Sequence, residues 1–228
     1  MQVLRSGGER LPSRTRPYGP YVLPLVAAIV AAATTLDVVA GGPLRRFDDW
    51  IFAGGLPPRT GAWHWFWRTI VNGGQYWLVG TGAALAALWA AWRIRDRGWP
   101  RVLWLLATAA AWLVGTELVI RAAQVGFGRT PPRTGADHMF QDGFLSYPSG
   151  HAANGAACWI FILAVLGASR RWTIAVHALV AAVAVAVVAL GYHWPTDAIA
   201  GWGLGVLLGC AGRALVLGWA GSQRAPDH

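Results

Sequence analysis

The sequence contains no lysine and few charged residues of any kind. Its 19 basic positions are all arginine, 10 residues are acidic, and charged side chains make up 13% of the 228 residues. Without a lysine amine there is no Schiff base, no lysine general base and no Walker-type phosphate loop. The charged fraction is about half that of a typical soluble domain, which argues against an ordinary cytosolic fold.

Cysteine is scarce, and long polar linkers are missing. The two cysteines, Cys158 and Cys210, lie in apolar stretches and do not suggest a disulfide framework. The 15 tryptophans and the 55% hydrophobic content exclude intrinsic disorder. With no soluble domain or fixed-period repeat in view, we expect one domain over residues 1–228.

Six apolar stretches are long enough to cross a bilayer, because a helix needs about 20 residues to span about 30 Å. They cover approximately residues 21–41, 76–94, 102–122, 151–169, 173–192 and 197–219. A cleaved signal peptide is the alternative for the first stretch, but that stretch is long for one and further stretches follow. The sequence therefore predicts an all-α integral membrane protein with six transmembrane helices.

The arginines predict how these helices are oriented. Six spans place both termini on one side, and that side carries Arg5, Arg10, Arg14, Arg16, Arg93, Arg95, Arg97, Arg101, Arg170, Arg171, Arg213 and Arg224, opposed by Glu9, Asp96 and Asp227. The other side carries as many acids as arginines, so the whole net charge of +9 lies on one face. By the positive-inside rule this face is cytoplasmic, which makes the basic charge a topology signal rather than a nucleic-acid-binding surface. We expect a multi-pass inner (plasma) membrane protein with short cytoplasmic tails at about 1–20 and 220–228.

Tryptophans and glycines refine this topology. Trp50, Trp63, Trp65, Trp67, Trp77 and Trp194 fall near the expected outer boundary, and Trp99, Trp172 and Trp219 near the inner one. Residues 43–72 are apolar but interrupted by charges, and we expect them to lie in the outer interface. Gly201, Gly205 and Gly209 recur every four residues, which predicts a face of close helix packing.

The candidate chemistry lies at the outer ends of the last spans. His151 and His193 are separated by two antiparallel stretches of about 20 residues, which return the chain to the same face. Asp197 follows His193 by four residues and can bind its other ring nitrogen. Ser149 and Gly150 precede the helix that His151 opens, and the unpaired N–H groups of a helix start can hold an anion. Either histidine alone would be an ordinary interfacial residue, but together these groups suit phosphoryl transfer through a phosphohistidine.

Two motifs carry a resemblance to a known family. PSGH at 148–151 and GYHWPTD at 191–197 resemble the second and third signature motifs of the type-2 phosphatidic acid phosphatase superfamily. These are membrane lipid phosphatases, related in fold to bacterial acid phosphatases and vanadium haloperoxidases, and the six-span layout is similar too. The resemblance implies that fold for the helical core.

The resemblance also implies a role for each matching residue. His193 would attack phosphorus, while Asp197 would orient the histidine and stabilise its charge. His151 would protonate the leaving oxygen. Ser149 and the Gly150 amide would hold phosphate oxygens.

The first motif of the family, K-x6-R-P, is altered here. A gapless match places Gln124 at the lysine and Pro131 at the second arginine, whereas a one-residue shift places Arg121 and Arg129 at the lysine and the motif arginine. The arginine of the third motif corresponds to Val187.

Three arginines are available as replacements. We expect Arg129 to bind phosphate, because a guanidinium can bind it with two hydrogen bonds. Arg133 either points into the site or is solvated on its loop. Arg121 follows Glu117 by four residues, so an intrahelical ion pair is the alternative to phosphate binding. His138, Asp137 and Asp142 in the outer loop either touch a head group or are solvated.

These features predict a membrane phosphatase that hydrolyses a lipid-linked phosphate, of phospholipid or polyprenyl type, at the outer leaflet. Its partners would be the lipid phosphate and the surrounding membrane lipids, with no metal, cofactor or nucleic acid; no oligomeric state is indicated. One alternative is a phosphotransferase that passes the phosphoryl group to a sugar or lipid hydroxyl. The other, motivated by the altered motifs, is a non-catalytic protein that binds or transports a lipid phosphate.

Overall fold

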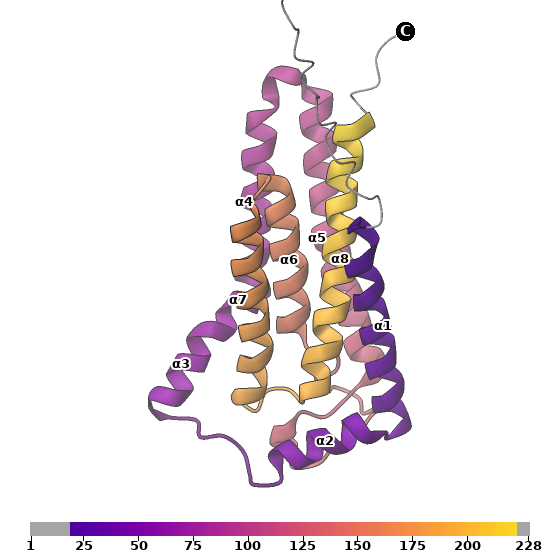
Figure 1. Ribbon diagram of the computed structural model, residues 1–228, viewed down its shortest axis with the longest axis vertical. Coiled ribbons are helices and arrows are strands. Elements are labelled where there is room, and N and C mark those ends of the chain that lie inside the picture. Colours follow the sequence, from indigo (N-terminus) through magenta and orange to yellow (C-terminus); the bar gives the residue numbers. More distant parts are fainter. Residues whose placement is uncertain (1–18, 223–228) are drawn as a thin grey trace, which may run out of the picture.

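The computed structural model describes residues 19–222, and the regular secondary structure of that part is helical throughout (Figure 1). The helices are α1 (Gly19–Ala40), α2 (Pro43–Phe52), α3 (Gly61–Val71), α4 (Tyr76–Arg93), α5 (Trp99–Phe127), α6 (Gly150–Leu166), α7 (Arg170–Ala189) and α8 (Pro195–Ser222). Short 3₁₀ turns occur at Asn72–Gly74, Arg95–Arg97 and Pro132–Thr134. The all-α prediction is therefore confirmed.

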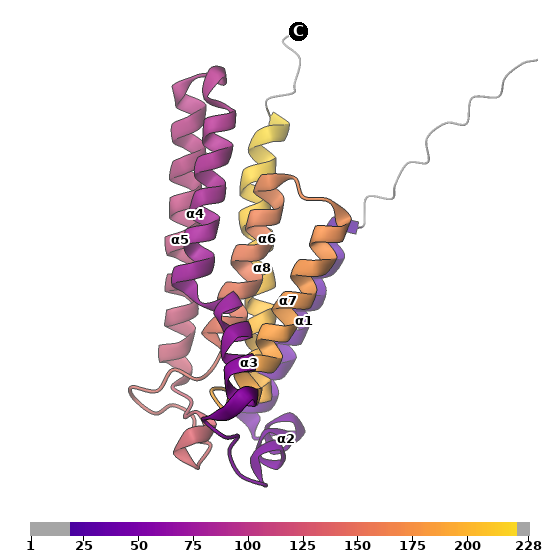
Figure 2. The same ribbon diagram turned by 90° about the vertical axis from the view of Figure 1, so that its left-hand side faces the viewer.

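Each stretch predicted to span the membrane is a helix in the bundle. Figure 2 shows α4 and α5 as a pair on one side, α1 and α7 on the other, and α6 and α8 between them. Four of these helices, α1, α5, α7 and α8, are long and apolar enough to cross a bilayer, and α6 is a shorter apolar helix. The protein is thus a multi-pass membrane protein, while the count of six spans stays a prediction.

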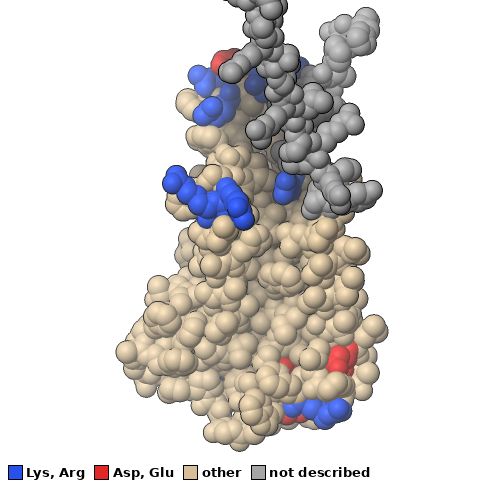
Figure 3. All heavy atoms as spheres, viewed as in Figure 1, with Lys and Arg blue, Asp and Glu red and all other residues tan. Residues whose placement is uncertain are grey.

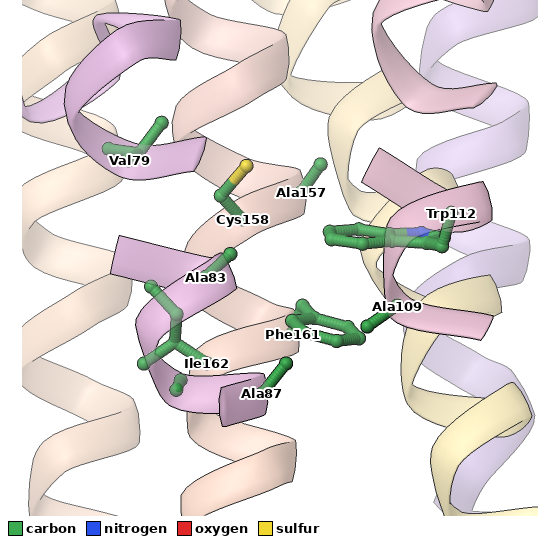
Figure 4. Packing of buried hydrophobic residues seen from close by; sticks show 10 residues of the cluster. Val79, Ala83, Ala87, Ala109, Trp112, Ala157, Cys158, Phe161 and Ile162 are labelled. Carbon is green, nitrogen blue, oxygen red and sulfur yellow. The ribbon is translucent and has the colours of Figure 1, made fainter. Parts of the chain in front are cut away.

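Helix α6 lies in the middle of the bundle and contacts α4, α5, α7 and α8. Figure 4 shows one side of this packing, where Ala83 of α4 and Trp112 of α5 meet Phe161 of α6. The rings of Trp112 and Phe161 are stacked with their centroids 4.2 Å apart. Trp112 also donates a hydrogen bond to the carbonyl of Leu208 at 2.8 Å, which ties α5 to α8. These contacts set the positions of the helix ends that carry the polar residues.

The glycines of α8 form the predicted packing face against α6. A Cβ atom added at Gly201 would lie 2.5 Å from the carbonyl oxygen of Ser149, and one at Gly209 would lie 2.8 Å from the Cβ of Ile160. At Gly205 an added Cβ would overlap the carbonyl oxygen of Ala153. Only glycine allows this approach, which holds the start of α6 against the start of α8.

Helices α2 and α3 lie at one end of the bundle (Figure 1). Helix α2 turns its apolar side outwards, since Phe47 and Trp50 are 46% and 69% exposed whereas Asp48 is fully buried. A helix with this arrangement suits a membrane interface, where the apolar side meets lipid. Helix α3 likewise exposes Trp63 and Trp65.

Charged and tryptophan residues concentrate at the two ends of the molecule. Figure 3 shows Arg, Asp and Glu side chains at both ends, with a band of uncharged residues between them on this face. Of the tryptophans placed at the boundaries, Trp50, Trp63, Trp65, Trp77, Trp99 and Trp172 are exposed. Arg5, Arg10, Arg14, Arg16, Arg224, Glu9, Asp227 and the side chain of Trp219 lie outside the described part.

Trp194 corrects the boundary assignment. It is only 4% exposed, and its Nε1 donates to the carbonyl of Thr130 at 2.8 Å. The ring therefore packs inside the protein and does not contribute to the outer belt.

The glycine face gives a matched pair of substitutions. Gly205→Ala should destabilise the protein by about 1–3 kcal/mol, because the added methyl forces α6 and α8 apart. Gly115→Ala on α5, where an added Cβ meets nothing within 4 Å, should be neutral or stabilise by up to about 1 kcal/mol. Thermal unfolding of both variants in detergent tests this, and equal melting temperatures would contradict the packing role of Gly205.

Candidate active site

The two histidines lie side by side at the end of the bundle that carries α2 and α3. His151 is in the first turn of α6, and His193 is in the turn between α7 and α8. Their ring centroids are 6.1 Å apart, with the planes inclined by 68°. The Nε2 atom of His151 is buried and has no hydrogen-bond partner. This confirms the expectation from the sequence that His151 and His193 lie close together at one end of the bundle.

The hydrogen bonds of His193 define which nitrogen is free in the neutral ring. Its Nδ1 lies 2.9 Å from the carbonyl oxygen of Ser146, and a carbonyl can only accept. Nδ1 therefore carries the proton, and Nε2 keeps the lone pair. Asp197 Oδ2 is farther from Nδ1, at 3.5 Å. His193 thus donates the short hydrogen bond that fixes its tautomer to the carbonyl of Ser146, a residue that sequence reasoning missed.

Asp197 is fully buried and held from three directions. Its Oδ2 accepts from the Ser146 hydroxyl at 2.5 Å and from the Trp194 amide at 3.0 Å. Its Oδ1 accepts from Arg129 at 2.7 Å. The carboxylate is therefore fixed beside the His193 ring.

Arg129 has every N–H group engaged by the protein. Its Nε and Nη2 donate to Asp137 at 2.8 and 2.7 Å, and Nη2 also donates to Asp48 at 2.8 Å. Its Nη1 donates to Thr196 and Asp197, both at 2.7 Å. A guanidinium has five N–H groups, so none remains for a substrate. The expectation that Arg129 binds phosphate is wrong in this geometry, because the side chain is a buried structural cation behind Asp197.

The other two acids of this network come from outside the recognised motifs. Asp48 lies on α2 and Asp137 in the loop after α5, where the second also accepts from Arg45 at 2.7 Å. Burial raises the pKa of Asp48 to about 6. Burial also acts to raise the pKa of Asp137, but hydrogen bonds from Arg129 and Arg45 outweigh it and hold that pKa below its usual value. Asp137 is thus not a solvated loop residue, whereas His138 and Asp142 are exposed.

A cavity of about 270 Å³ opens in front of the histidine pair. Both histidines line it, together with Gly150 and Gln124. Gln124, which the gapless match places at the family's lysine, is a neutral amide that donates to the carbonyl of Pro148 at 3.1 Å, in the loop that enters α6.

Ser149 does not line this cavity. It is fully buried, and its hydroxyl caps α6 by accepting from the Ala152 amide at 3.4 Å. Its own amide donates to the carbonyl of Asp197 at 2.9 Å. In this geometry Ser149 shapes the start of α6, while the cavity itself is lined by Gly150.

Arg121 is the arginine that lines the cavity. It is half exposed and lies 3.5 Å from Glu117, so the alternative of an intrahelical ion pair is confirmed. Arg121 can form this ion pair and still line the cavity, because Glu117, one helical turn away, lines the same cavity.

Two more arginines lie near the site without lining the cavity. Arg133 caps the end of α7 by donating to the carbonyls of Leu190 and Gly191 at 2.6 and 3.2 Å. Arg68 of α3, which sequence reasoning missed, donates to the Tyr192 hydroxyl at 2.5 Å. Only the aromatic, interrupted character of residues 43–72 hinted that this segment reaches the site.

Comparison with known proteins fits this geometry. The model of the PAP2 superfamily matches residues 117–219, which contain both histidines and Asp197. The matched segment covers just under half of the chain, and over that segment the sequence is similar to the PAP2 superfamily. Within this segment, the gapless match of the first motif places Gln124 at the family's lysine, whereas the shifted match places Arg121 there; Val187, at the arginine of the third motif, is fully buried.

The fold is also similar to a solved structure. The crystal structure of a transmembrane PAP2-type phosphatidylglycerolphosphate phosphatase from Bacillus subtilis matches with a TM-score of 0.54 and 21% identity. The match covers 92% of this chain and 100% of that chain, so the likeness extends over the whole helical bundle. No curated protein matches the sequence.

The buried carboxylate of Asp48 predicts a pH dependence of stability. Since burial raises its pKa to about 6 from 3.8, the folded protein binds this proton more tightly than the unfolded chain. The resulting stabilisation is full below about pH 4 and is lost as the pH rises through 6. The melting temperature of wild type minus that of Asp48→Asn should therefore fall between pH 4 and 7. Asp49→Asn, at the exposed neighbouring position, is the matched control, and a difference that does not change with pH would contradict the burial effect.

Proposed function

We propose that the protein is a membrane phosphatase that hydrolyses a lipid-linked phosphate at the outer leaflet through a phosphohistidine intermediate. The observation that carries this proposal is the facing pair His151 and His193 in front of an open cavity. The Nε2 atom of His151 has no hydrogen-bond partner among the described residues, and the Nε2 atom of His193 carries the lone pair. One nitrogen can thus attack phosphorus while the other transfers a proton.

The reaction would proceed in two steps. His193 Nε2 attacks phosphorus, the bond from phosphorus to the ester oxygen breaks, and a protonated His151 gives its proton to the leaving alkoxide. Water then attacks the phosphohistidine and loses a proton to His151, which releases inorganic phosphate and restores both rings. Asp197 and the Ser146 carbonyl stabilise the positive charge that His193 gains.

The phosphate would be held by the start of α6 and by Arg121. The first amides of α6, those of Gly150 and His151, lie outside the helical hydrogen-bond ladder and can donate to an anion. Arg121 supplies the positive charge in the cavity. The site lies at the end of the bundle with the interfacial helices, so the tail of the substrate would remain in the bilayer.

Substitution of the histidines tests the chemistry. His193→Ala should abolish phosphate release from a panel of lipid phosphates, and His151→Ala should slow it by about 10²–10⁴-fold, as expected for a lost general acid. Phosphate release by purified protein and ³²P labelling of the chain after a denaturing quench are the measurements.

Other outcomes separate the alternative functions. Substrate consumption that depends on an added alcohol, without free phosphate, would indicate a phosphotransferase. No turnover by the wild type over the whole panel would favour a non-catalytic lipid-phosphate binder.

Arg121 gives a second test of the site. Arg121→Gln should lower kcat/KM by about 10- to 100-fold, because the cavity loses its charged hydrogen-bond donor, and Arg121→Lys should restore part of it. Arg46→Gln, an exposed arginine at the same end of the protein, is the matched control and should keep wild-type kinetics. Equal kinetics for the Arg121 and Arg46 variants would remove Arg121 from the phosphate site.

A further inference from the structure

We infer that the cavity contains a subsite for hydroxyl groups of the substrate, formed by Glu117 and Asn154. This inference rests on the proposed function and extends it to the substrate class, a phosphate monoester of a polyol head group such as a glycerol or a sugar. Phosphate attached directly to a diacylglycerol or a polyprenol would be a poorer substrate.

The polar lining of the cavity continues beyond the histidine pair. Asn154 follows His151 by three residues on α6, so it lies on the same face about 4.5 Å further along the helix. Glu117, Arg121 and Gln124 share one face of α5 in the same way, and all of these residues line the one cavity. A phosphate held at His151 would therefore have Glu117 and Asn154 beside its alcohol portion.

The hydrogen bonding of Asn154 leaves an acceptor unused. Asn154 is 5% exposed, and its Nδ2 donates to Glu117 Oε2 at 3.2 Å. This bond directs the amide so that Oδ1 is the free atom, and Oδ1 is buried without a partner. Buried polar atoms are nearly always paired, so an unpaired acceptor in a cavity wall marks a position that a ligand can satisfy.

The chemistry of the two side chains selects the ligand. The Asn154 Oδ1 and the Glu117 carboxylate offer acceptors, which repel phosphate oxygens and gain nothing from an alkyl chain. The charge of Glu117 is already balanced by Arg121 at 3.5 Å, so a neutral donor suits the pair better than a cation. An alcohol O–H is such a donor. With the phosphate held at His151, a hydroxyl on the carbon next to the phosphate ester would face Glu117 and Asn154.

A comparison of two substrates tests the subsite. Phosphate release by the full-length protein in detergent is measured with phosphatidylglycerol phosphate, which has a free hydroxyl next to the phosphate ester, and with phosphatidic acid of the same acyl chains, which has none. Wild type should prefer the first substrate. Asn154→Leu and Glu117→Gln should lower the ratio of the two kcat/KM values by about 10-fold or more, because a site built to bind a hydroxyl discriminates against substrates that lack it.

The controls separate a structural role from recognition. Thr116→Val removes a buried hydroxyl of α5 that also has no partner but does not line the cavity, and it should leave the ratio unchanged. Equal losses for both substrates in Asn154→Leu and Glu117→Gln, or an unchanged ratio, would overturn the subsite.

A binding measurement distinguishes failure of the subsite from failure of the proposed function. The thermal shift of the His193→Ala protein with each lipid requires no turnover. Phosphatidylglycerol phosphate should give the larger shift, and addition of Asn154→Leu should abolish the difference. Equal shifts would overturn the subsite even if the wild type releases phosphate, whereas unequal shifts without turnover by the wild type would overturn only the phosphatase.

Discussion

The ion network around Arg129 is the interaction on which the rest of the site depends. One fully buried guanidinium joins Asp48 of α2, Asp137 of the loop after α5 and Asp197 of α8. Buried charges are stable only when all members are paired, and removal of one leaves the others uncompensated at a cost of about 3–5 kcal/mol. Through Asp197 the network also fixes Ser146, whose carbonyl sets the tautomer of His193. The orientation of the candidate nucleophile is thus a consequence of a salt-bridge network that does not touch the cavity.

A sequence pattern predicts features that depend on residues close together in the chain, and it does not predict contacts between distant ones. The helices and the meeting of His151 with His193 follow from apolar length, helical rise and two short motifs, all of which act over few residues. The role of Arg129 does not, because its partner Asp48 lies 81 residues away and no local pattern pairs the two. The same holds for Ser146, since a backbone carbonyl acts through its position and not through its residue type. Trp194 was misplaced for a related reason, because its position between two predicted spans suggests a membrane boundary while its indole is bound inside the protein.

The distribution of cations limits how this protein can hold an anion. Gln124, at the first-motif lysine in the gapless match, and Val187, at the third-motif arginine, are both neutral. Arg129 donates its hydrogen bonds to carboxylates of the protein itself. Arg121 in the cavity wall and the helix start at Gly150 remain on the face that a phosphate would meet. Binding would then depend more on backbone N–H groups than on side-chain charge.

Helix α2 links this site to the membrane surface. Its apolar side is exposed, while Asp48 on the opposite side is buried against Arg129 and Thr196. In water, the exposed apolar side of α2 would tend to pack against other apolar surface. At a membrane interface, it would contact lipid instead. The bilayer therefore favours the position of α2 in which Asp48 reaches the network. With α2 seated at an interface in this way, lipid contact with its apolar side would help to hold Asp197, and with it His193, in place through Asp48 and Arg129.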